Sequence, residues 1–294
     1  MPQHPEDCLQ TLLAGFAGRL FVGFSGGVDS TALLVAASRI REVNALHVDH
    51  GIHPESANWA EHCAEVCHAL DVSLTVTRLQ LPQTGNLEAN ARAERYEFYR
   101  QHVGENDLLL LGHHQTDQLE SVLLRMLQGR GMVAMQRRGQ VAGVPVARPF
   151  VDLHKSELVA YVEAAGQHWI EDPSNLDNQF DRNFLRNELL PSLLARWPDA
   201  AQAFQRVADS QRHRDQALDY LLSEYPDHLP LALLPDDEGV AVVILRTWLI
   251  GQGLFTTTDQ SLREFFAQCR RGDKARINIQ DRDLKLVGQN ILLE

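Results

Sequence analysis

Short apolar runs alternate with longer amphipathic stretches through the first half of the chain. The runs that predict buried strands are Arg19–Phe24, Val43–Val48, Val72–Thr77 and Asp107–Leu111. The stretches between and after them predict helices that open near Thr31, cover Ser56–Leu70 and Leu87–Val103, and open again near Thr116. Strands that alternate with helices are typical of a parallel sheet covered by helices on both faces. We therefore predict an α/β fold for this part of the chain.

The pattern changes from about Pro191 onward. One long helix is predicted over Asp199–Leu222, and two shorter helices over Val240–Gly251 and Gln260–Arg270. A pair of strand-like segments, Ala275–Ile279 and Leu284–Leu293, ends the sequence. We predict two domains, a larger one over residues 1–214 and a smaller, mostly helical one over residues 215–294.

The first predicted strand and helix are joined by a polar, glycine-containing turn. Its residues are Ser25, Gly26, Gly27, Val28, Asp29 and Ser30. Backbone N–H groups at a helix start lack intrahelical acceptors, and the helix dipole favours an anion there. The Walker A loop does not fit, because no Gly-Lys pair occurs in the chain, and the glycine spacing does not match the dinucleotide fingerprint. The turn therefore predicts a phosphate site without a lysine, or, more simply, a capped helix start.

Composition narrows the class of protein. Hydrophobic residues make up 44% and charged residues 22% of the 294 positions, which is typical of a globular protein. The net charge of −12 argues against a non-specific nucleic-acid coat. No apolar run is long enough to span a bilayer, the four cysteines are scattered, and the first residues lack a basic segment. We expect a cytoplasmic protein with no membrane partner.

Residues 121–151 contain no acidic side chain but several arginines, among them Arg130, Arg137 and Arg138. Glycines at 129, 131, 139 and 143 predict a flexible loop there rather than a packed element. Such a loop is either a solvated basic segment or a local contact surface for phosphates.

Two further polar clusters follow predicted strands. Asp117 and Glu120 lie one helical turn apart, where a carboxylate either suits the helix start or, with Asp29 across the neighbouring strand end, holds Mg²⁺ beside a bound triphosphate. The other cluster is His47–His53, and together with His113 and His114 it is compatible with a zinc hydrolase. That interpretation leaves the glycine turn unexplained.

Taken together, several segments resemble the tRNA(Ile)-lysidine synthase family within the PP-loop ATP pyrophosphatase superfamily. The matching segments are Phe24–Ser30, His47–Gly51, Asn86–Tyr96, Leu111–Glu120, Arg148–Phe150, Trp169–Asn175 and Phe180–Asn187. The first is shared by the whole superfamily, and the last two are far more discriminating. The resemblance implies a Rossmann-like, doubly wound parallel sheet of the PP-loop ATPase type, followed by a small helical domain that contacts tRNA.

The family's reaction, as the resemblance implies it, has two steps. ATP adenylates the C2 oxygen of the wobble cytidine in the isoleucine tRNA with a CAU anticodon, and the ε-amine of free L-lysine then displaces AMP. Ser25–Ser30 would cradle pyrophosphate, Asp29 and Asp117 would hold Mg²⁺, and Arg92 would stabilise charge on the adenylate. Glu120 or Asp172 would receive the lysine ammonium. Asn175, Arg182 and Asn183 would lie over the nucleotide or the base, and Arg130, Arg137 and Arg138 would contact anticodon phosphates.

Two departures from the family pattern bear on these roles. Thr116 stands where the family usually has the first of two adjacent aspartates, so Asp117 is expected to carry the ionic role. Longer members continue into a third domain, and whether one belongs to this protein stays open. A homodimer is compatible with the sequence.

Two alternatives stay open beside this prediction. One is another PP-loop adenylating enzyme, such as a 2-thiolase or an amidating enzyme. The Cys63–Cys67 spacing, which is not C-x-x-C, counts against the thiolase. The other is a tRNA-binding protein that has lost catalysis, and the joint presence of Ser25, Asp29 and Asp117 counts against it.

Overall fold

The computed structural model describes residues 4–49, 51, 56–79, 87–254, 258–272 and 274–294. Within these ranges the chain divides into two compact units, Met1–Ala208 and Asp209–Glu294. Each unit has its own sheet and its own hydrophobic core. The functional labels of the two predicted domains, and their boundary after residue 214, stay predictions.

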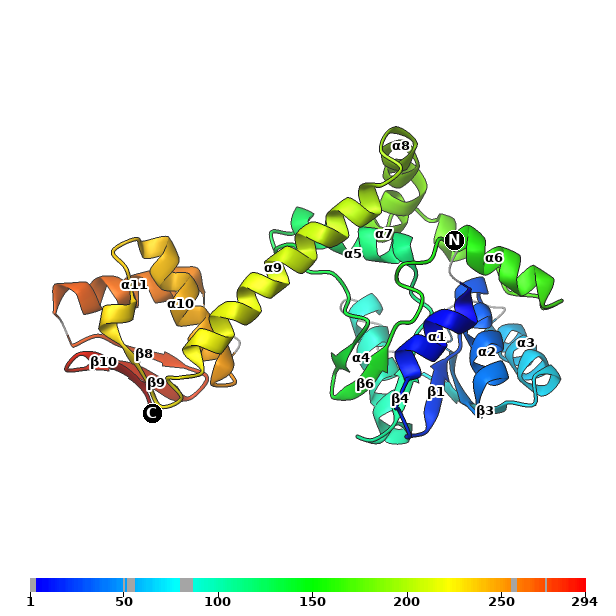
Figure 1. The fold of residues 1–294 in the computed structure, drawn as a ribbon, viewed down its shortest axis with the longest axis horizontal. Coiled ribbons are helices and arrows are strands. Elements are labelled where there is room, and N and C mark those ends of the chain that lie inside the picture. The colour runs from blue at the N-terminus through cyan, green and yellow to red at the C-terminus, as the bar shows by residue number, and fades with distance from the viewer. Residues whose placement is uncertain (1–3, 50, 52–55, 80–86, 255–257, 273) are drawn as a thin grey trace. The chain divides into compact units, whose positions relative to one another are not determined.

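The first unit is built on a six-stranded sheet with the order β3-β2-β1-β4-β6-β5 (Figure 1). Its strands are β1 (Leu20–Gly23), β2 (Asn44–Asp49), β3 (Ser73–Arg78), β4 (Leu108–Leu110), β5 (Arg138–Val141) and β6 (Val144–Ala147). All neighbouring pairs are parallel except β5 and β6, which form an antiparallel hairpin at one edge. The α/β, doubly wound fold predicted from the alternating pattern is confirmed.

Helices cover both faces of this sheet, as the alternation of apolar strands with amphipathic helices predicts. On one face, α1 (Pro5–Leu13), α2 (Val28–Ile40), α3 (Ser56–Ala69) and α6 (Lys155–Ala164) enclose the larger core. On the other face, α4 (Leu87–His102) packs Tyr96, Phe98 and Tyr99 against Phe21, Leu46 and Leu109. The strands β1 and β4 are buried on both sides, so their sequences are continuous apolar runs rather than alternating ones.

The remaining elements of the first unit follow the sheet or flank its carboxyl edge. They are α5 (Gln115–Leu127), η1 (Pro173–Leu176), α7 (Asp181–Phe184), the π-helical turn η2 (Leu185–Leu189), α8 (Leu190–Arg196) and the first part of α9 (Ala200–Leu222). A small core of Leu119, Leu190 and Ala201 joins α5 to α8 and α9. This core holds the start of α5 beside the segment that carries α7.

The hairpin of β5 and β6 corrects one prediction. Residues 121–151 were expected to be a loop, yet Arg138–Val141 and Val144–Ala147 are paired strands joined by Ala142 and Gly143, whose φ angles are +50° and +80°. Two consecutive positive φ angles are typical of a type I′ hairpin turn. Residues 121–127 belong to α5, so within the arginine-rich segment only residues 128–137, which include Arg130 and Arg137, and 148–151 lack regular structure.

The second unit combines helices with an antiparallel sheet of order β7-β10-β9-β8. Its further elements are β7 (His228–Pro230), η3 (Leu231–Leu233), α10 (Glu238–Gly251), α11 (Asp259–Arg271), β8 (Arg276–Ile279), β9 (Arg282–Val287) and β10 (Asn290–Leu293). Trp248, Phe265 and Leu284 lie in its core. The predicted strand Leu284–Leu293 is in fact parts of two strands, β9 and β10, which form a hairpin. No helix within the described ranges is both long and apolar enough to cross a bilayer.

Candidate functional site

A cavity of about 400 Å³ lies where β1, β2 and β4 end at the carboxyl edge of the first sheet. Strand β1 has β2 on one side and β4 on the other. From β1, the chain first adds β2 and β3 on one side and then crosses over to add β4 on the other, so the order of strand addition reverses at β1. Such switch points are where open α/β sheets bind ligands. The lining residues come from three strand ends and the segments after them, and from α2, α4, α5, η1, α7 and η2: Gly23, Phe24, Ser25, Gly27, Asp29, Ser30, Val48, Arg92, Arg95, Tyr96, Tyr99, Leu111, Gly112, His113, Asp117, Asn175, Arg182, Asn183 and Arg186.

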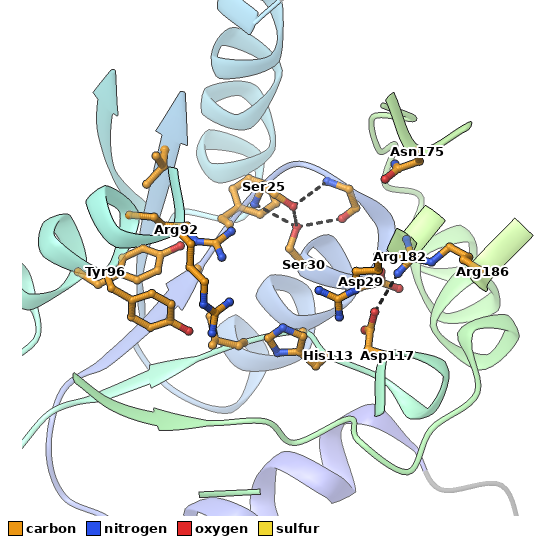
Figure 2. A pocket seen from close by; sticks show the side chains of 18 of the residues that line it. Ser25, Asp29, Ser30, Arg92, Tyr96, His113, Asp117, Asn175, Arg182 and Arg186 are labelled. Carbon is orange, nitrogen blue, oxygen red and sulfur yellow. Dashed lines mark hydrogen bonds and ion pairs between the residues drawn. The ribbon is translucent and has the colours of Figure 1, made fainter. Parts of the chain in front are cut away.

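The glycine turn between β1 and α2 is held by its own serines (Figure 2). Ser30 Oγ donates to the Gly27 carbonyl over 3.0 Å and accepts from the Ser25 backbone N–H over 3.2 Å, and the two serine hydroxyls are 3.0 Å apart. Gly27 is the N-cap of α2 and supplies no side chain to the orphan N–H groups. These N–H groups and hydroxyls are therefore placed to bind an anion.

Gly26 does not line the cavity, but it adopts a backbone conformation that the turn requires. Its φ is +83°, and a Cβ there would lie 2.7 Å from Ile170 Cδ1 and 3.0 Å from Cys63 Sγ. The Gly26 carbonyl accepts from the Ile170 N–H over 2.8 Å, which ties the segment after α6 to the turn. Val28 is also absent from the lining, because its side chain is buried in the core. Of the six predicted ATP-binding residues, Ser25, Gly27, Asp29 and Ser30 thus line the cavity.

Asp29 and Asp117 both line the cavity, from the first turns of α2 and α5, and His114 lies within reach of both. His114 Nε2 is 3.7 Å from Asp29 Oδ1 and 3.6 Å from Asp117 Oδ2. Gly112 makes this approach possible, because a Cβ on it would lie 2.7 Å from the Asp29 carbonyl oxygen. The two carboxylates that the sequence placed across adjacent strand ends therefore do meet at one pocket.

The two carboxylates differ in their surroundings. Burial raises the pKa of Asp29, and its Oδ1 is buried without a hydrogen-bond partner. Burial also acts to raise the pKa of Asp117, but His114, His113 and the His114 N–H outweigh it, so that pKa lies below its usual value. A buried carboxylate oxygen without a donor beside a second carboxylate fits a hard cation such as Mg²⁺, which prefers oxygen ligands.

The start of α5 is capped by the histidine that precedes it. Its N-cap is His114, whose Nδ1 accepts from the Thr116 N–H over 3.2 Å, while Asp117 Oδ2 accepts from the His114 N–H over 3.0 Å. Thr116 lies inside the first turn instead of capping it. Asp117 is thus a structural cap and a pocket-lining carboxylate at once.

Glu120 is absent from the cavity lining, and its predicted contact with a lysine ammonium stays a prediction. It is fully buried. Arg186 donates to both of its oxygens, and Arg182 Nε donates to Oε2 over 2.9 Å. Two guanidinium groups already occupy this carboxylate, so it positions Arg182 and Arg186, which do line the pocket.

Arg186 joins Glu120 to the carboxylate pair and was not among the predicted site residues. Its Nη2 donates to Asp117 Oδ1 over 3.0 Å. It lies in the π-helical turn η2, and such turns are frequent at functional sites. The signal that could have identified it is its spacing of four from Arg182 within Phe180–Asn187, which puts both arginines on one face.

Of the predicted site residues in the segment from Trp169 to Asn183, Asn175 and Asn183 also line the cavity and Asp172 does not. The Asn183 side-chain amide donates to the carbonyls of Ser174 and Asp177, which anchors α7 on η1. Asp172 caps η1 through the Ser174 N–H and is absent from the lining, so the structure does not place it in contact with a bound substrate.

Arginines of α4 form the opposite wall from Asn175 and Arg186, as Figure 2 shows for Arg92. Arg92 and Arg95 line the cavity, and their guanidinium carbons lie 5.0 and 5.8 Å from the centre of the Tyr96 ring. His113 faces the same cavity. Burial lowers its pKa to about 4, with help from Arg148, Arg182 and Arg95 and against Asp117, so its imidazole is neutral at pH 7.

The zinc-hydrolase alternative finds no support among the described residues. His47 is buried, with Nδ1 2.9 Å from the Phe24 carbonyl and 3.4 Å from Cys63 Sγ. His50 and His53 lie outside the described residues, as does Asn86. Over the part of the chain that the structure describes, no three His, Cys, Asp or Glu side chains are grouped as metal ligands.

The arginines predicted to contact anticodon phosphates lie away from the cavity. Arg137 pairs with Asp152. Arg138 donates to the Leu12 carbonyl and lies 5.6 Å from the centre of the Phe16 ring. Arg130 is exposed, and its carbonyl accepts from Arg125. The contacts of Arg137 and Arg138 stabilise the hairpin against neighbouring elements, and the phosphate role stays a prediction.

Comparisons with known proteins identify relatives of this chain. The model of the PP-loop domain family matches residues 4–193. A tRNA(Ile)-lysidine synthase of Histophilus somni (strain 129Pt) is 37% identical over 215 residues, covering 70% of this chain and 50% of that protein. One of Pseudomonas syringae pv. tomato (strain ATCC BAA-871 / DC3000) is 38% identical over 217 residues, covering 71% and 49%. The chain thus spans about half the length of these curated relatives.

Among solved structures, the U34-tRNA thiolase NcsA from Methanococcus maripaludis with its 4Fe–4S cluster has a similar fold. The TM-score is 0.58 at 14% sequence identity, and the match covers 70% of this chain and 78% of that one. At this identity the likeness extends to the fold alone.

Proposed function

The chain belongs to the PP-loop domain family, and from this premise we propose that it is a tRNA(Ile)-lysidine synthase. The proposed reaction joins free L-lysine to C2 of the wobble cytidine of the isoleucine tRNA with a CAU anticodon. ATP supplies the activating adenylate, and AMP and pyrophosphate leave. The observation that carries the proposal is that the glycine turn, α4, the start of α5 and residues 175–186 line one cavity, in a chain 37–38% identical to relatives of that name.

The glycine turn is suited to hold the β- and γ-phosphates of ATP. Ser25, Gly27 and Ser30 line the cavity, and hydrogen bonds within the turn hold the two serine hydroxyls in place. Donors fixed in this way stabilise the charge that develops on pyrophosphate as it leaves, with little reorganisation. The cytidine oxygen would then attack the α-phosphate from the side of the cavity that the turn leaves open.

Asp29 and Asp117 are the residues that would hold Mg²⁺. A divalent cation between them would neutralise triphosphate charge and polarise the bond to the leaving group. Arg186 keeps Asp117 in place over 3.0 Å, and the Asp29 Oδ1 without a donor is available for a cation. Arg92, from α4, would contact the adenylate.

The carboxylate-lined side of the cavity is suited to the amino acid. Glu120 or Asp172, beside that side, would receive the lysine ammonium, while Arg182 and Asn183 would face the nucleotide or the cytosine. The ε-amine attacks C2, the C–O bond to AMP breaks, and the amine gives up one proton. We further propose cytoplasmic action, where tRNA and free lysine are present, and a homodimer is tested by light scattering.

A thiolase would need reactive or cluster-binding cysteines. Cys63 and Cys67 are buried, and burial raises the pKa of each thiol to about 12, so neither is a thiolate at neutral pH. This favours an amine rather than a sulfur acceptor at the proposed site.

One assay tests the proposal. The protein is incubated with ATP, Mg²⁺, labelled lysine and the CAU-anticodon isoleucine tRNA, and tRNA-bound label, AMP and pyrophosphate are measured. We expect equal amounts of all three, and no label when the wobble base is uridine. ADP as the nucleotide product, or AMP release without label in tRNA, would overturn the proposal.

A further inference from the structure

Gln118 lies in the first turn of α5, directly after Asp117, but its side chain binds a loop instead of lining the cavity. It is only 4% exposed. Its Nε2 donates to the Met135 carbonyl over 2.7 Å, and its Oε1 accepts from the Met135 N–H over 2.8 Å. The amide thus satisfies both backbone groups of one residue, as a neighbouring strand would. Gln118 therefore ties one end of the basic loop, which we define as residues 128–137, to the helix that carries Asp117.

Two arginines hold the same basic loop near its two ends. Arg125 Nη2 donates to the Arg130 carbonyl over 3.2 Å, and the Arg130 N–H donates to the Arg125 carbonyl over 2.8 Å. At the other end, the buried Arg148 donates from Nη1 to the Gln136 carbonyl over 2.9 Å. The Arg148 backbone N–H donates to the Arg137 carbonyl over 2.8 Å. The basic loop is therefore fixed at both ends, although it contains no regular secondary structure.

These contacts use carbonyl groups of the loop and leave N–H groups free. The carbonyls of Gln136 and Arg137 accept from Arg148, but the N–H groups of these two residues have no acceptor among the described hydrogen bonds. The exposed Arg130 has no ion-pair partner within the described ranges. No acidic residue occurs between positions 121 and 151. Free N–H groups and a free guanidinium on an acid-free stretch of chain favour an anion such as a phosphodiester.

We propose that Gln118 is a positioning residue for RNA, whose two hydrogen bonds to Met135 hold the basic loop in the shape that binds the phosphodiester backbone of the substrate. The inference rests on the proposed function, which makes an RNA the substrate. It deepens that function by naming the residue that shapes one RNA-contacting surface. Gln118 touches no reacting atom and acts through the loop. Loss of its amide should therefore weaken RNA binding and leave the pyrophosphate turn intact.

A purely local role for Gln118 leads to a different expectation. Because Asp117 directly precedes Gln118, a change at Gln118 would in that case disturb the start of α5. Asp117 lines the cavity, so binding of a phosphate ligand there would suffer as much as binding of RNA. Comparison of the two ligands separates the two roles.

The experiment breaks the pair of hydrogen bonds from both sides. Gln118→Met removes both bonds at nearly constant volume, and Met135→Pro removes the loop N–H without altering α5. Gln140→Met is the control, because it makes the same chemical change at an exposed position of β5. Early trypsin cleavage sites in each variant of the full chain are identified by mass spectrometry. Binding of pyrophosphate and of an anticodon stem-loop RNA is measured by calorimetry, and melting temperatures report folding.

We expect Gln118→Met and Met135→Pro to be cleaved after Arg130 or Arg137 about tenfold faster than the unaltered chain, the effect of losing one or two ordinary hydrogen bonds. RNA binding should weaken about tenfold, with a salt dependence reduced by about one phosphate contact. Pyrophosphate binding should stay within about twofold of the unaltered chain. Gln140→Met should match the unaltered chain in all three measurements.

Three results would overturn the inference. Unchanged cleavage and RNA binding in both variants would mean that the hydrogen bonds to Met135 do not shape the loop. Faster cleavage without weaker RNA binding would remove the loop from the RNA contact. Equal weakening of pyrophosphate and RNA would assign the effect to α5 itself. If Gln118→Met melts early, Met135→Pro alone decides among these results.

The inference and the proposed function fail in different ways. Proteolysis and binding do not depend on turnover, so a negative lysine-incorporation assay is distinguishable from a loop that Gln118 does not shape. An unaltered chain that does not bind the RNA would overturn the proposed function, and this inference with it.

Discussion

Arg186 holds Glu120 through two parallel hydrogen bonds, from Nε to Oε1 over 2.6 Å and from Nη2 to Oε2 over 2.9 Å. Glu120 is fully buried, and Arg182 shares its second oxygen. Bidentate pairs of this kind fix orientation as well as charge. The carboxylate therefore acts on the cavity through the two arginines that it positions.

Replacing Glu120 with Gln should unfold the chain more easily and reduce turnover. The amide keeps the volume but leaves two guanidinium groups without their counter-charge. Because both arginines are partly exposed to water, we expect a loss of about 2 kcal/mol of unfolding free energy, below the usual cost of breaking a fully buried pair. Urea denaturation measures it. Glu97→Gln removes an exposed pair and should cost less than about 1 kcal/mol.

Replacing Gly26 with Ala should damage the glycine turn through both conformation and contact. The φ of +83° is unfavourable for alanine, and the new Cβ would approach Ile170 and Cys63 too closely. We expect a lower melting temperature and at least tenfold weaker pyrophosphate binding. Gly166→Ala is the matched control, since its φ is +66° but nothing lies within 4 Å of the new Cβ. An equal loss of stability in both variants would mean that the contact with Ile170 has no effect.

Replacing Asp29 with Asn should raise stability at neutral pH while abolishing turnover. Burial raises the pKa of Asp29, so its ionised form disfavours the folded state above that pKa. Asn removes this cost. The gain in melting temperature over the unaltered chain should therefore shrink as the pH falls through the raised pKa and vanish below the ordinary one. A gain that persists at low pH would contradict this account.

His113 should make the fold sensitive to mild acid. Its pKa is lowered from 6.5 to about 4, chiefly by burial, so the folded state resists protonation that the unfolded chain accepts. The stability that this neutral imidazole contributes is complete above pH 6.5 and is lost as the pH falls towards 4. His113→Gln should flatten the pH dependence of the melting temperature in that window. His68→Gln, at an exposed position on α3, should leave the dependence unchanged.

The sequence predicts those parts of the fold whose signals are local. Leu20–Gly23 and Leu108–Leu110 are uniformly apolar because both faces are covered, and the turn between β1 and α2 has unmistakable glycines. The β5–β6 hairpin escaped prediction because Ala142 occupies a positive-φ position where Asn or Gly would be the usual signal. The sequence did not predict His114 as the N-cap of α5, because Ser, Thr and Asp are the common N-cap residues and Thr116 lies two residues away.

The candidate site was less predictable than the fold, because its contacts join residues far apart in sequence. The turn, Asp29 and Asp117 follow from strand-end positions. Arg182 and Arg186 shield Glu120 because α5 packs against α7 and η2. No local sequence pattern specifies this packing. The same holds for Tyr96, which the apolar stripe of α4 marks as core, although it also lines the cavity among arginines.

The cavity is assembled from residues 23 to 186, and this has a consequence during synthesis of the protein. A nascent chain that has emerged only as far as α5 carries the glycine turn and both aspartates, but it lacks Arg182 and Arg186 to neutralise Glu120. Domains fold largely as units while they leave the ribosome. The growing polypeptide therefore passes through a stage in which the residues of the glycine turn have emerged but the cavity lining is incomplete. The full lining is present only when the residues up to 186 have emerged.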